Sequence, residues 1–103
     1  MSISLKDLIL SVQDRKLSKD QLEHYRDQMS ELYALMSIEM AEIEKTEAIF
    51  FSECDEPTDV AKKRKWSVTK EGQRQIELKN YLKGTEKMLS SLKSRLYSMF
   101  YYE

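Results

Sequence analysis

The sequence is poor in the residues that make tight turns. Its 103 residues include only two glycines and one proline. Glycine supplies positive φ angles and proline a fixed φ at turns, so a fold with many strands and frequent reversals is excluded. Leu, Met, Lys, Glu, Gln and Arg dominate instead, and all six are good helix formers. The composition therefore predicts an all-α protein with a few long helices.

Side chains that carry out catalysis or bind metals are equally scarce. The chain has one cysteine, Cys54, and one histidine, His24, which excludes an intrachain disulfide and a multi-cysteine metal site. It lacks a glycine-rich phosphate loop and the Glu-x-x-His pairs of dinuclear carboxylate bundles. His24 is typical of a solvated or helix-packing residue. We therefore expect a protein that is not an enzyme and needs no cofactor.

Long hydrophobic runs are missing as well. No stretch approaches the roughly 18 apolar residues of a membrane-spanning helix. The N-terminal apolar run is too short and too interrupted for a signal peptide. A single cysteine also suits a reducing compartment. These observations favour a cytoplasmic protein with no membrane partner.

Hydrophobic spacing predicts three helices within a single domain of residues 1–103. The first is short, over about residues 4–13, and begins at a Ser4 cap. A helix of this length is marginal in water, so it must dock on another element. We expect it to cover one end of two longer helices. The alternative is an arm exchanged with a neighbouring subunit.

The second helix is predicted over about residues 19–53. Ser18 and Gln21 have the spacing of a capping box, and Leu17 and Leu22 have that of a hydrophobic staple. Its apolar residues form two stripes, which indicates more than one partner helix. The smaller stripe consists of Leu35, Ile38 and Ile49.

The helical pattern stops over about residues 54–68, which include the proline and several acidic turn residues. A connection of this length lets the chain reverse its direction. The third helix is predicted over about residues 69–102, capped by Thr69 or Ser67. It returns beside the second helix as a long antiparallel αα-hairpin. Gly84 indicates a point of close approach between helices, and the alternative is a flexible hinge.

The third helix carries a heptad seam, with apolar residues at alternating steps of four and three. Two helices that touch along one stripe bury little surface, so we expect oligomerisation as a helical bundle or coiled coil. The aromatic C-terminal end either joins this interface or packs on the first helix. The expected interface residues are Leu78, Leu82, Leu89, Leu92, Leu96, Met99, Phe100 and Tyr101.

Charge is distributed unevenly, although the net charge is only −1. Residues 1–56 contain 6 Lys+Arg and 13 Asp+Glu, whereas residues 57–103 contain 11 and 5. The two halves should therefore attract each other. One interpretation is that this polarity sets antiparallel pairing, and the alternative is that the basic half also binds a polyanion.

The most strongly charged segment is the run Lys62–Trp66 in the predicted connector. Adjacent cations attract a phosphate backbone by counterion release, and a tryptophan can stack on an unpaired base for about 1–3 kcal/mol. Single-stranded DNA uses both features. The alternatives are a solvated connector and contact with an acidic protein surface. The expected nucleic-acid-binding residues are Lys62, Lys63, Arg64, Lys65, Trp66, Lys70 and Arg74.

With the helix that follows it, this segment resembles the recombination mediators of T4-like phages, over roughly residues 20–100. The other residues that carry the likeness are Thr69, Gly72, Leu78, Leu89, Leu92, Ser94, Arg95 and Leu96. The resemblance implies that Lys62–Lys65 contact single-stranded DNA and that Leu89–Phe100 hold subunits together. It also implies that the protein loads or stabilises a recombinase on that DNA, in the host cytoplasm if the chain is encoded by a phage.

Two functional hypotheses of different classes follow. The first is a non-enzymatic oligomer that binds single-stranded DNA through its basic connector, as a recombination accessory protein. The second is a small phage-type inhibitor that binds a host defence or nucleic-acid enzyme through its acidic helix and apolar seams. A plain structural adaptor is a third hypothesis.

Overall fold

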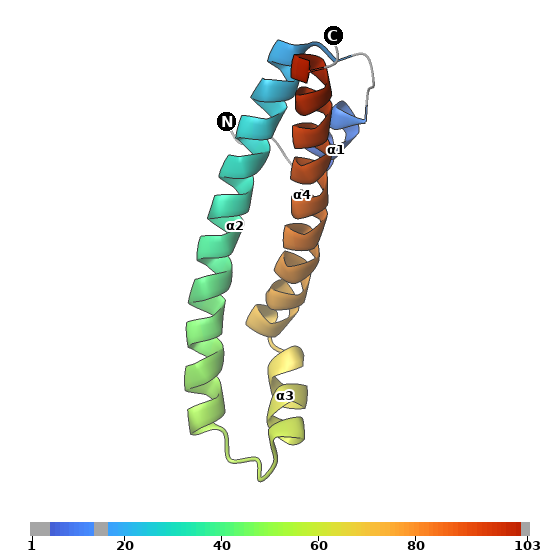
Figure 1. Ribbon diagram of the computed structural model, residues 1–103. Helices are drawn as coiled ribbons and strands as arrows, with labels where there is room; N and C mark the ends of the chain where they lie inside the picture. The colour runs from blue at the N-terminus through green and yellow to red at the C-terminus, as the bar shows by residue number, and fades with distance from the viewer. Residues whose placement is uncertain (1–4, 14–16, 102–103) are drawn as a thin grey trace. The chain divides into compact units, whose positions relative to one another are not determined.

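The computed structural model describes residues 5–13 and 17–101, with only the backbone of Phe100 and Tyr101. Across these residues the chain forms four helices and no strand, so the predicted all-α class is confirmed. The predicted Ser4 cap falls outside the described residues. As Figure 1 shows, the helices are α1 (Leu5–Val12), α2 (Lys19–Glu53), α3 (Asp59–Ser67) and α4 (Lys70–Tyr101).

The start of α2 has the predicted capping box. The backbone N–H of Ser18 donates to Oε1 of Gln21 at 2.8 Å, and the backbone N–H of Gln21 donates to Oγ of Ser18 at 3.2 Å. Each side chain thus satisfies a backbone donor that has no acceptor within the helix. Leu17 and Leu22 are both buried in one hydrophobic cluster, as the staple requires.

Residues 59–67 form α3 where the sequence predicted an irregular connector over 54–68. Thr58 caps this helix, because its Oγ1 accepts from the backbone N–H of Ala61 at 3.2 Å. Asp59 adds a negative charge to the first turn, where the helix dipole favours it. The prediction of an irregular connector was therefore wrong for most of its length. The breaker residues end α2, but Thr58 and Asp59 start a new helix, and the good helix formers Ala61–Lys65 extend it.

The described chain packs as two units. Unit 1 consists of α1, α2 up to Leu35 and α4 from Lys83. Unit 2 consists of α2 from Met36, α3 and α4 up to Leu82. The two long helices therefore contribute to both units, whereas α1 belongs to the first and α3 to the second.

In unit 1, α1 completes a hydrophobic core with segments of α2 and α4. Leu8, Leu22 and Leu92, one from each helix, are at most 1% exposed, and burying one leucine side chain stabilises by about 1.5–3 kcal/mol. The guanidinium of Arg95 donates to the carbonyl of Val12 at 2.6 Å, which satisfies a carbonyl at the end of α1. The short first helix therefore docks on its own chain. The other buried members of this core are Val12, Leu17, Met29 and Leu96.

In unit 2, α3 and α4 meet at a tight joint. Oγ1 of Thr69 accepts from the backbone N–H of Gly72 at 2.9 Å, so Thr69, one of the two predicted candidates, caps α4. The same hydroxyl donates to the carbonyl of Trp66 at 2.6 Å. A Cβ atom on Gly72 would lie 2.0 Å from that carbonyl oxygen. Because backbone atoms cannot rotate away, only glycine fits at this position.

Gly84, in unit 1, does not mark a close approach between helices. A Cβ atom there would have no atom of a neighbouring side chain or element within 4 Å. The prediction for Gly84 was therefore wrong, and the close approach occurs at Gly72. Since glycine costs about 1 kcal/mol relative to alanine inside a helix, Gly84 weakens α4 without any packing benefit.

Candidate nucleic-acid interface

The basic run Lys62–Lys65 lies on α3, where it winds around the helix axis. Successive residues are about 100° apart in a helix of 3.6 residues per turn, so four adjacent cations cannot share one face. Lys62 is half-buried, whereas Lys63, Arg64 and Lys65 are exposed. The helix therefore disperses the charges that an extended connector would have presented together.

Lys65 is paired with an acidic residue from the segment before α3. Its Nζ lies 2.9 Å from Oε1 of Glu56. The hydrogen bond to Glu56, together with its negative charge, raises the pKa of Lys65 above its usual value. A phosphate would have to compete with Glu56 for this ammonium group, so Lys65 is a weaker anion ligand than the sequence suggests.

Arg74 forms a two-point ion pair inside unit 2. Its Nε donates to Oε2 of Glu39 at 2.7 Å, and its Nη2 donates to Oε1 of the same carboxylate at 2.9 Å. Glu77 provides a second carboxylate, 3.5 Å from Nη1. Hydrogen bonding by Arg74 lowers the pKa of Glu39, and the same bond raises the pKa of Arg74. The guanidinium fork thus joins α4 to α2 and is already occupied.

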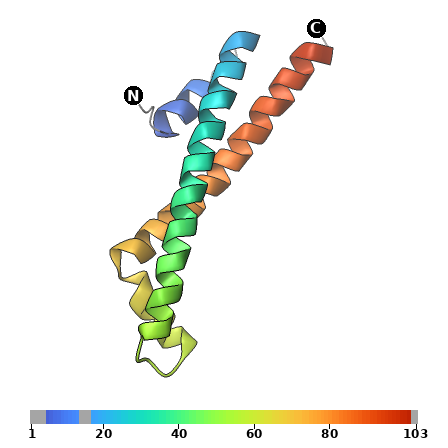
Figure 2. The same ribbon diagram turned by 90° about the vertical axis from the view of Figure 1, so that its left-hand side faces the viewer.

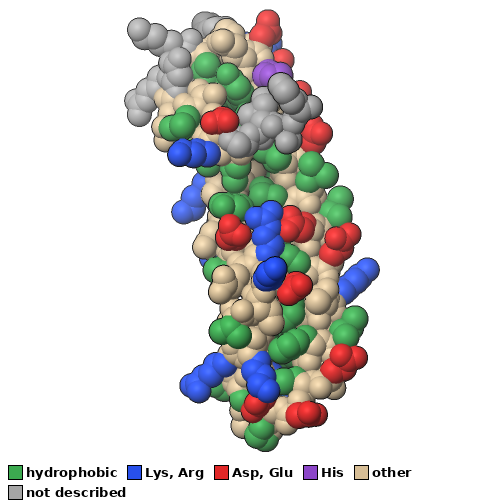
Figure 3. Space-filling model, turned by 180° about the vertical axis from the view of Figure 1, so that it is seen from behind, with side chains coloured by type: hydrophobic (Ala, Val, Ile, Leu, Met, Phe, Trp, Pro, Cys, Tyr) green, Lys and Arg blue, Asp and Glu red, His purple; other side chains and the backbone are tan. Residues whose placement is uncertain are grey.

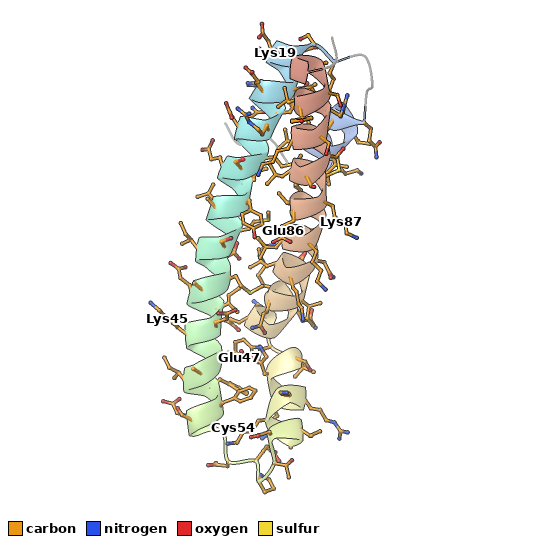
Figure 4. The ribbon with its side chains drawn as sticks, in the orientation of Figure 1. Lys19, Lys45, Glu47, Cys54, Glu86 and Lys87 are labelled. Carbon is orange, nitrogen blue, oxygen red and sulfur yellow. The ribbon has the colours of Figure 1, made fainter. Side chains whose placement is uncertain are left out.

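Trp66 packs inside unit 2 and is only 5% exposed. Its Nε1–H donates to Oε1 of Gln75 at 2.7 Å, and its ring centroid lies 5.4 Å from that of Phe50. The amide of Gln75 in turn donates to Oε1 of Glu47 at 3.3 Å, and Figure 4 shows Glu47 directed from α2 toward α4. The predicted stacking of Trp66 on an unpaired base is inconsistent with this burial.

Besides Lys65, which is paired with Glu56, three predicted residues have exposed side chains: Lys63 and Arg64 on α3, and Lys70 at the start of α4. Asp59 and Glu71, on the same two helices, are exposed as well. Figure 3 shows basic and acidic side chains interspersed with hydrophobic ones on the face it presents. Among the residues coloured there, no broad patch of a single sign covers that face.

The seam predicted to join subunits is largely used within the chain. Leu78 and Leu92 are 0% exposed, and Leu96 is 5% exposed. A second copy cannot reach these leucines without displacing α4 from its own core. The half-buried members of the seam are Leu82, Leu89 and Met99. The side chains of Phe100 and Tyr101, also predicted at this interface, lie outside the described residues.

Other chemistry is sparse in the part of the chain that the structure describes. His24 is exposed beside the ring of Tyr25, and Cys54 is half-buried. Within residues 5–13 and 17–101, no group of three or more His, Cys, Asp or Glu could hold a metal ion. None of the helices formed by these residues combines the length and apolar character needed to cross a membrane.

Two side-chain networks were not foreseen from the sequence. The uneven charge of the sequence was an indication of the pair Glu39–Arg74, because this pair joins the acidic half of the chain to the basic half. Nothing in the sequence indicated the hydrogen-bonded chain from Trp66 through Gln75 to Glu47, since a tryptophan and a glutamine nine residues apart suggest no contact. Both networks hold unit 2 together, and each contains one residue with a predicted DNA contact, Arg74 in the first and Trp66 in the second.

Comparison with protein-family models, with curated proteins and with solved structures found no significant match. The resemblance to phage recombination mediators therefore stays a prediction.

Proposed function

We propose that this protein is a non-enzymatic helical interaction module that forms a long antiparallel αα-hairpin and associates with a second copy of itself. The observation that carries the proposal is an outward face of α2 in unit 2, where Ile38 and Ile49 are 59% and 58% exposed. Isoleucine is among the residues most often buried in folded proteins. Two isoleucines on one uncovered helix face favour a binding surface over a simple solvated face.

Contacts between α2 and α4 support the hairpin in this proposal. In unit 1 the hydroxyl of Tyr33 donates to Oε1 of Glu86 at 2.7 Å. In unit 2 Glu39 accepts from Arg74. Later residues of α2 thus meet earlier residues of α4, which is the order of an antiparallel pair. The seam of α4 serves this packing within the chain, so the outward face of α2 is the candidate surface for association.

Sedimentation equilibrium over a wide range of protein concentrations tests the proposal. We expect a mass that rises with concentration above the 12.2 kDa of one chain. The mass of a single chain at every concentration would refute self-association. That result would favour the other partner considered above, a host defence or nucleic-acid enzyme bound through the acidic helix and this apolar face.

A second candidate function is electrostatic binding of single-stranded DNA, as in a recombination accessory protein. The exposure of Lys63, Arg64 and Lys70 supports it. Because Trp66 is buried, binding would rest on phosphate contacts, with little base preference and a steep dependence on salt. The single cysteine, Cys54, supports placing either function in the reducing cytoplasm.

Fluorescence anisotropy of a labelled oligonucleotide at several salt concentrations tests this second function. The triple variant Lys63→Ala, Arg64→Ala, Lys70→Ala should lose measurable binding at low salt. A triple variant of exposed lysines on α4 changes the net charge equally and should bind more tightly than the first. Equal loss in both triple variants, or no binding by the unaltered protein, would rule out a DNA site formed by Lys63, Arg64 and Lys70. The control substitutions are Lys79→Ala, Lys83→Ala and Lys87→Ala.

A further inference from the structure

The outward face of α2 in unit 2 has the spacing of a coiled-coil seam. Four of its residues follow one another at steps of four, three and four, which places them on one side of the helix. All four are exposed, whereas Met36 and Ile43 on the opposite side of this segment are buried. We name these four residues the outer stripe: Ile38, Glu42, Lys45 and Ile49.

The outer stripe is uncovered within its unit. Figure 4 shows Lys45 pointing away from α3 and α4, whereas Glu47 points toward them. Figure 2 views this segment of α2 from the side opposite α3, and none of the helices of unit 2 lies in front of it. Ala41 and Ala48 flank the stripe and are also exposed. Such small side chains let a second helix approach closely.

We infer that the outer stripe pairs with the same stripe of a second copy in an antiparallel coiled coil. The two-fold axis would pass between Ile43 and Glu44. The inference rests on the self-association proposed above and adds to it a surface, a register and a direction.

Charge selects the antiparallel direction. With the axis in this position, Ile38 faces Ile49 of the second copy, and Glu42 faces Lys45 of the second copy. The two-fold symmetry repeats each contact, so the interface gains two isoleucine pairs and two opposite-charge pairs. A parallel pair in register would set Glu42 against Glu42 and Lys45 against Lys45, and directly opposed like charges are destabilising.

The flanks of the stripe agree with this register. On one flank Ala41 faces Ala48 of the second copy, which permits close packing. On the other flank Glu39 faces Thr46 of the second copy, and the charge of Glu39 is already balanced by Arg74. No like charges meet beside the seam in this arrangement.

The contact is short, and a weak dimer is expected. Residues 36–53 of α2 extend roughly 27 Å at about 1.5 Å per residue. Their pairing therefore falls at the lower end of the range of protein interfaces. We expect a reversible dimer with a dissociation constant in the micromolar range.

Charge reversal tests both the surface and the direction. Glu42→Lys alone and Lys45→Glu alone each set like charges opposite one another twice per dimer, and each should weaken dimerisation about tenfold. The double variant E42K/K45E restores opposite charges in an antiparallel dimer, so its dissociation constant should return to within about threefold of the original. In a parallel dimer the double variant would still set like charges opposite one another, so dimerisation would not recover. The matched control is Glu44→Lys, the same charge change at an exposed position of α2 outside the stripe.

Sedimentation equilibrium measures each dissociation constant, and circular dichroism verifies that each variant is helical. Weakening in both single variants, rescue in the double variant and no change in Glu44→Lys would support the inference. A dissociation constant that is unchanged by the single charge reversals, or that the double variant does not restore, would overturn the inference. Self-association itself would remain supported. A monomeric unaltered protein would overturn both.

Discussion

Gly72 is the residue on which the joint between α3 and α4 depends. Alanine at this position would set its Cβ against the backbone carbonyl of Trp66, 2.0 Å away. We expect Gly72→Ala to lower the free energy of unfolding by about 1–3 kcal/mol, as overpacked positions do. Urea denaturation followed by circular dichroism measures this loss.

Gly84 provides the matched control for that substitution. It lies inside the same helix, and a Cβ there would meet no neighbour within 4 Å. Gly84→Ala should therefore raise the free energy of unfolding by about 0.5–1 kcal/mol, because alanine is the better helix former. A similar gain for Gly72→Ala would contradict the joint described above.

The contrast between these glycines shows which residue-level predictions a sequence supports. Ser18 and Gln21 were predicted correctly, because a capping box is a contact between residues three apart. The sequence places Gly72 in the first turn of its helix and Gly84 in the interior, but only the path of the neighbouring backbone shows that Gly72 must be glycine. The burial of Trp66 likewise depends on Phe50, which belongs to a different helix. For this reason the sequence could not show that Trp66 is unavailable for stacking on a base.

At the scale of the element, the capping box should contribute measurably to α2. Ser18→Ala removes the acceptor for the Gln21 N–H and should cost about 1 kcal/mol of unfolding free energy. Gln21→Ala removes the reciprocal bond, and the double variant should lose less than the sum of the two single losses. Urea denaturation of the three variants measures this coupling.

Ser30→Ala is the control, since Ser30 is exposed in the interior of the same helix. It should leave stability unchanged or slightly improved. Full additivity of the Ser18 and Gln21 substitutions would show that the two bonds act independently, contrary to a reciprocal cap.

The ion pair between α2 and α4 predicts a dependence on pH. The pKa of Glu39 is lowered by its hydrogen bond with Arg74 from an ordinary value of 4.5. A carboxyl whose pKa is depressed in the folded state stabilises that state above its unfolded pKa, and the stabilisation disappears as pH falls through the folded pKa. Because both side chains are 40% exposed, solvent screening limits the contribution to at most about 1 kcal/mol.

The readout is the stability difference between the unaltered protein and Arg74→Gln. This difference should be present near pH 7 and shrink below about pH 4. Lys79→Gln, which removes an exposed positive charge on α4, controls for net charge and should not show this loss. A difference for Arg74→Gln that persists unchanged in acid would contradict the assigned pair.

The helices themselves were predictable where their apolar spacing is long and regular. α2 and α4 each carry seams of several turns, and their bounds match the prediction to within a residue or two. α3 was missed because it has nine residues and its charged run has no apolar period. The sequence does contain a signal for the start of α3, since Thr58 followed by Asp59 is a common helix-initiating pair.

At the scale of the whole molecule, self-association should make stability depend on protein concentration. A dimer that forms only from folded chains gains apparent stability as concentration rises above its dissociation constant. The midpoint of thermal unfolding should therefore increase with concentration in the unaltered protein. The increase should be much smaller in Glu42→Lys and should return in E42K/K45E. A midpoint that is constant over a range in which sedimentation detects dimers would contradict coupling between folding and association.

The charge asymmetry of the chain bears on its folding as well as on its ligands. Contacts such as Glu39–Arg74 show acidic residues of the first half neutralising basic residues of the second. A surplus of lysine and arginine in a sequence therefore overstates the number of cationic side chains that are available to bind a phosphate backbone. How much of that surplus is neutralised depends on which residues the fold brings together, and composition alone does not show this.

Trp66 is the only tryptophan of the chain, and it lies beside Phe50 in unit 2. Its emission, excited where tyrosine does not absorb, is therefore an intrinsic optical marker for one half of the protein. Water reaching the indole would move that emission to longer wavelengths. Recording the colour change beside the far-ultraviolet signal of all helices would reveal whether the two halves melt in a single step or one after the other.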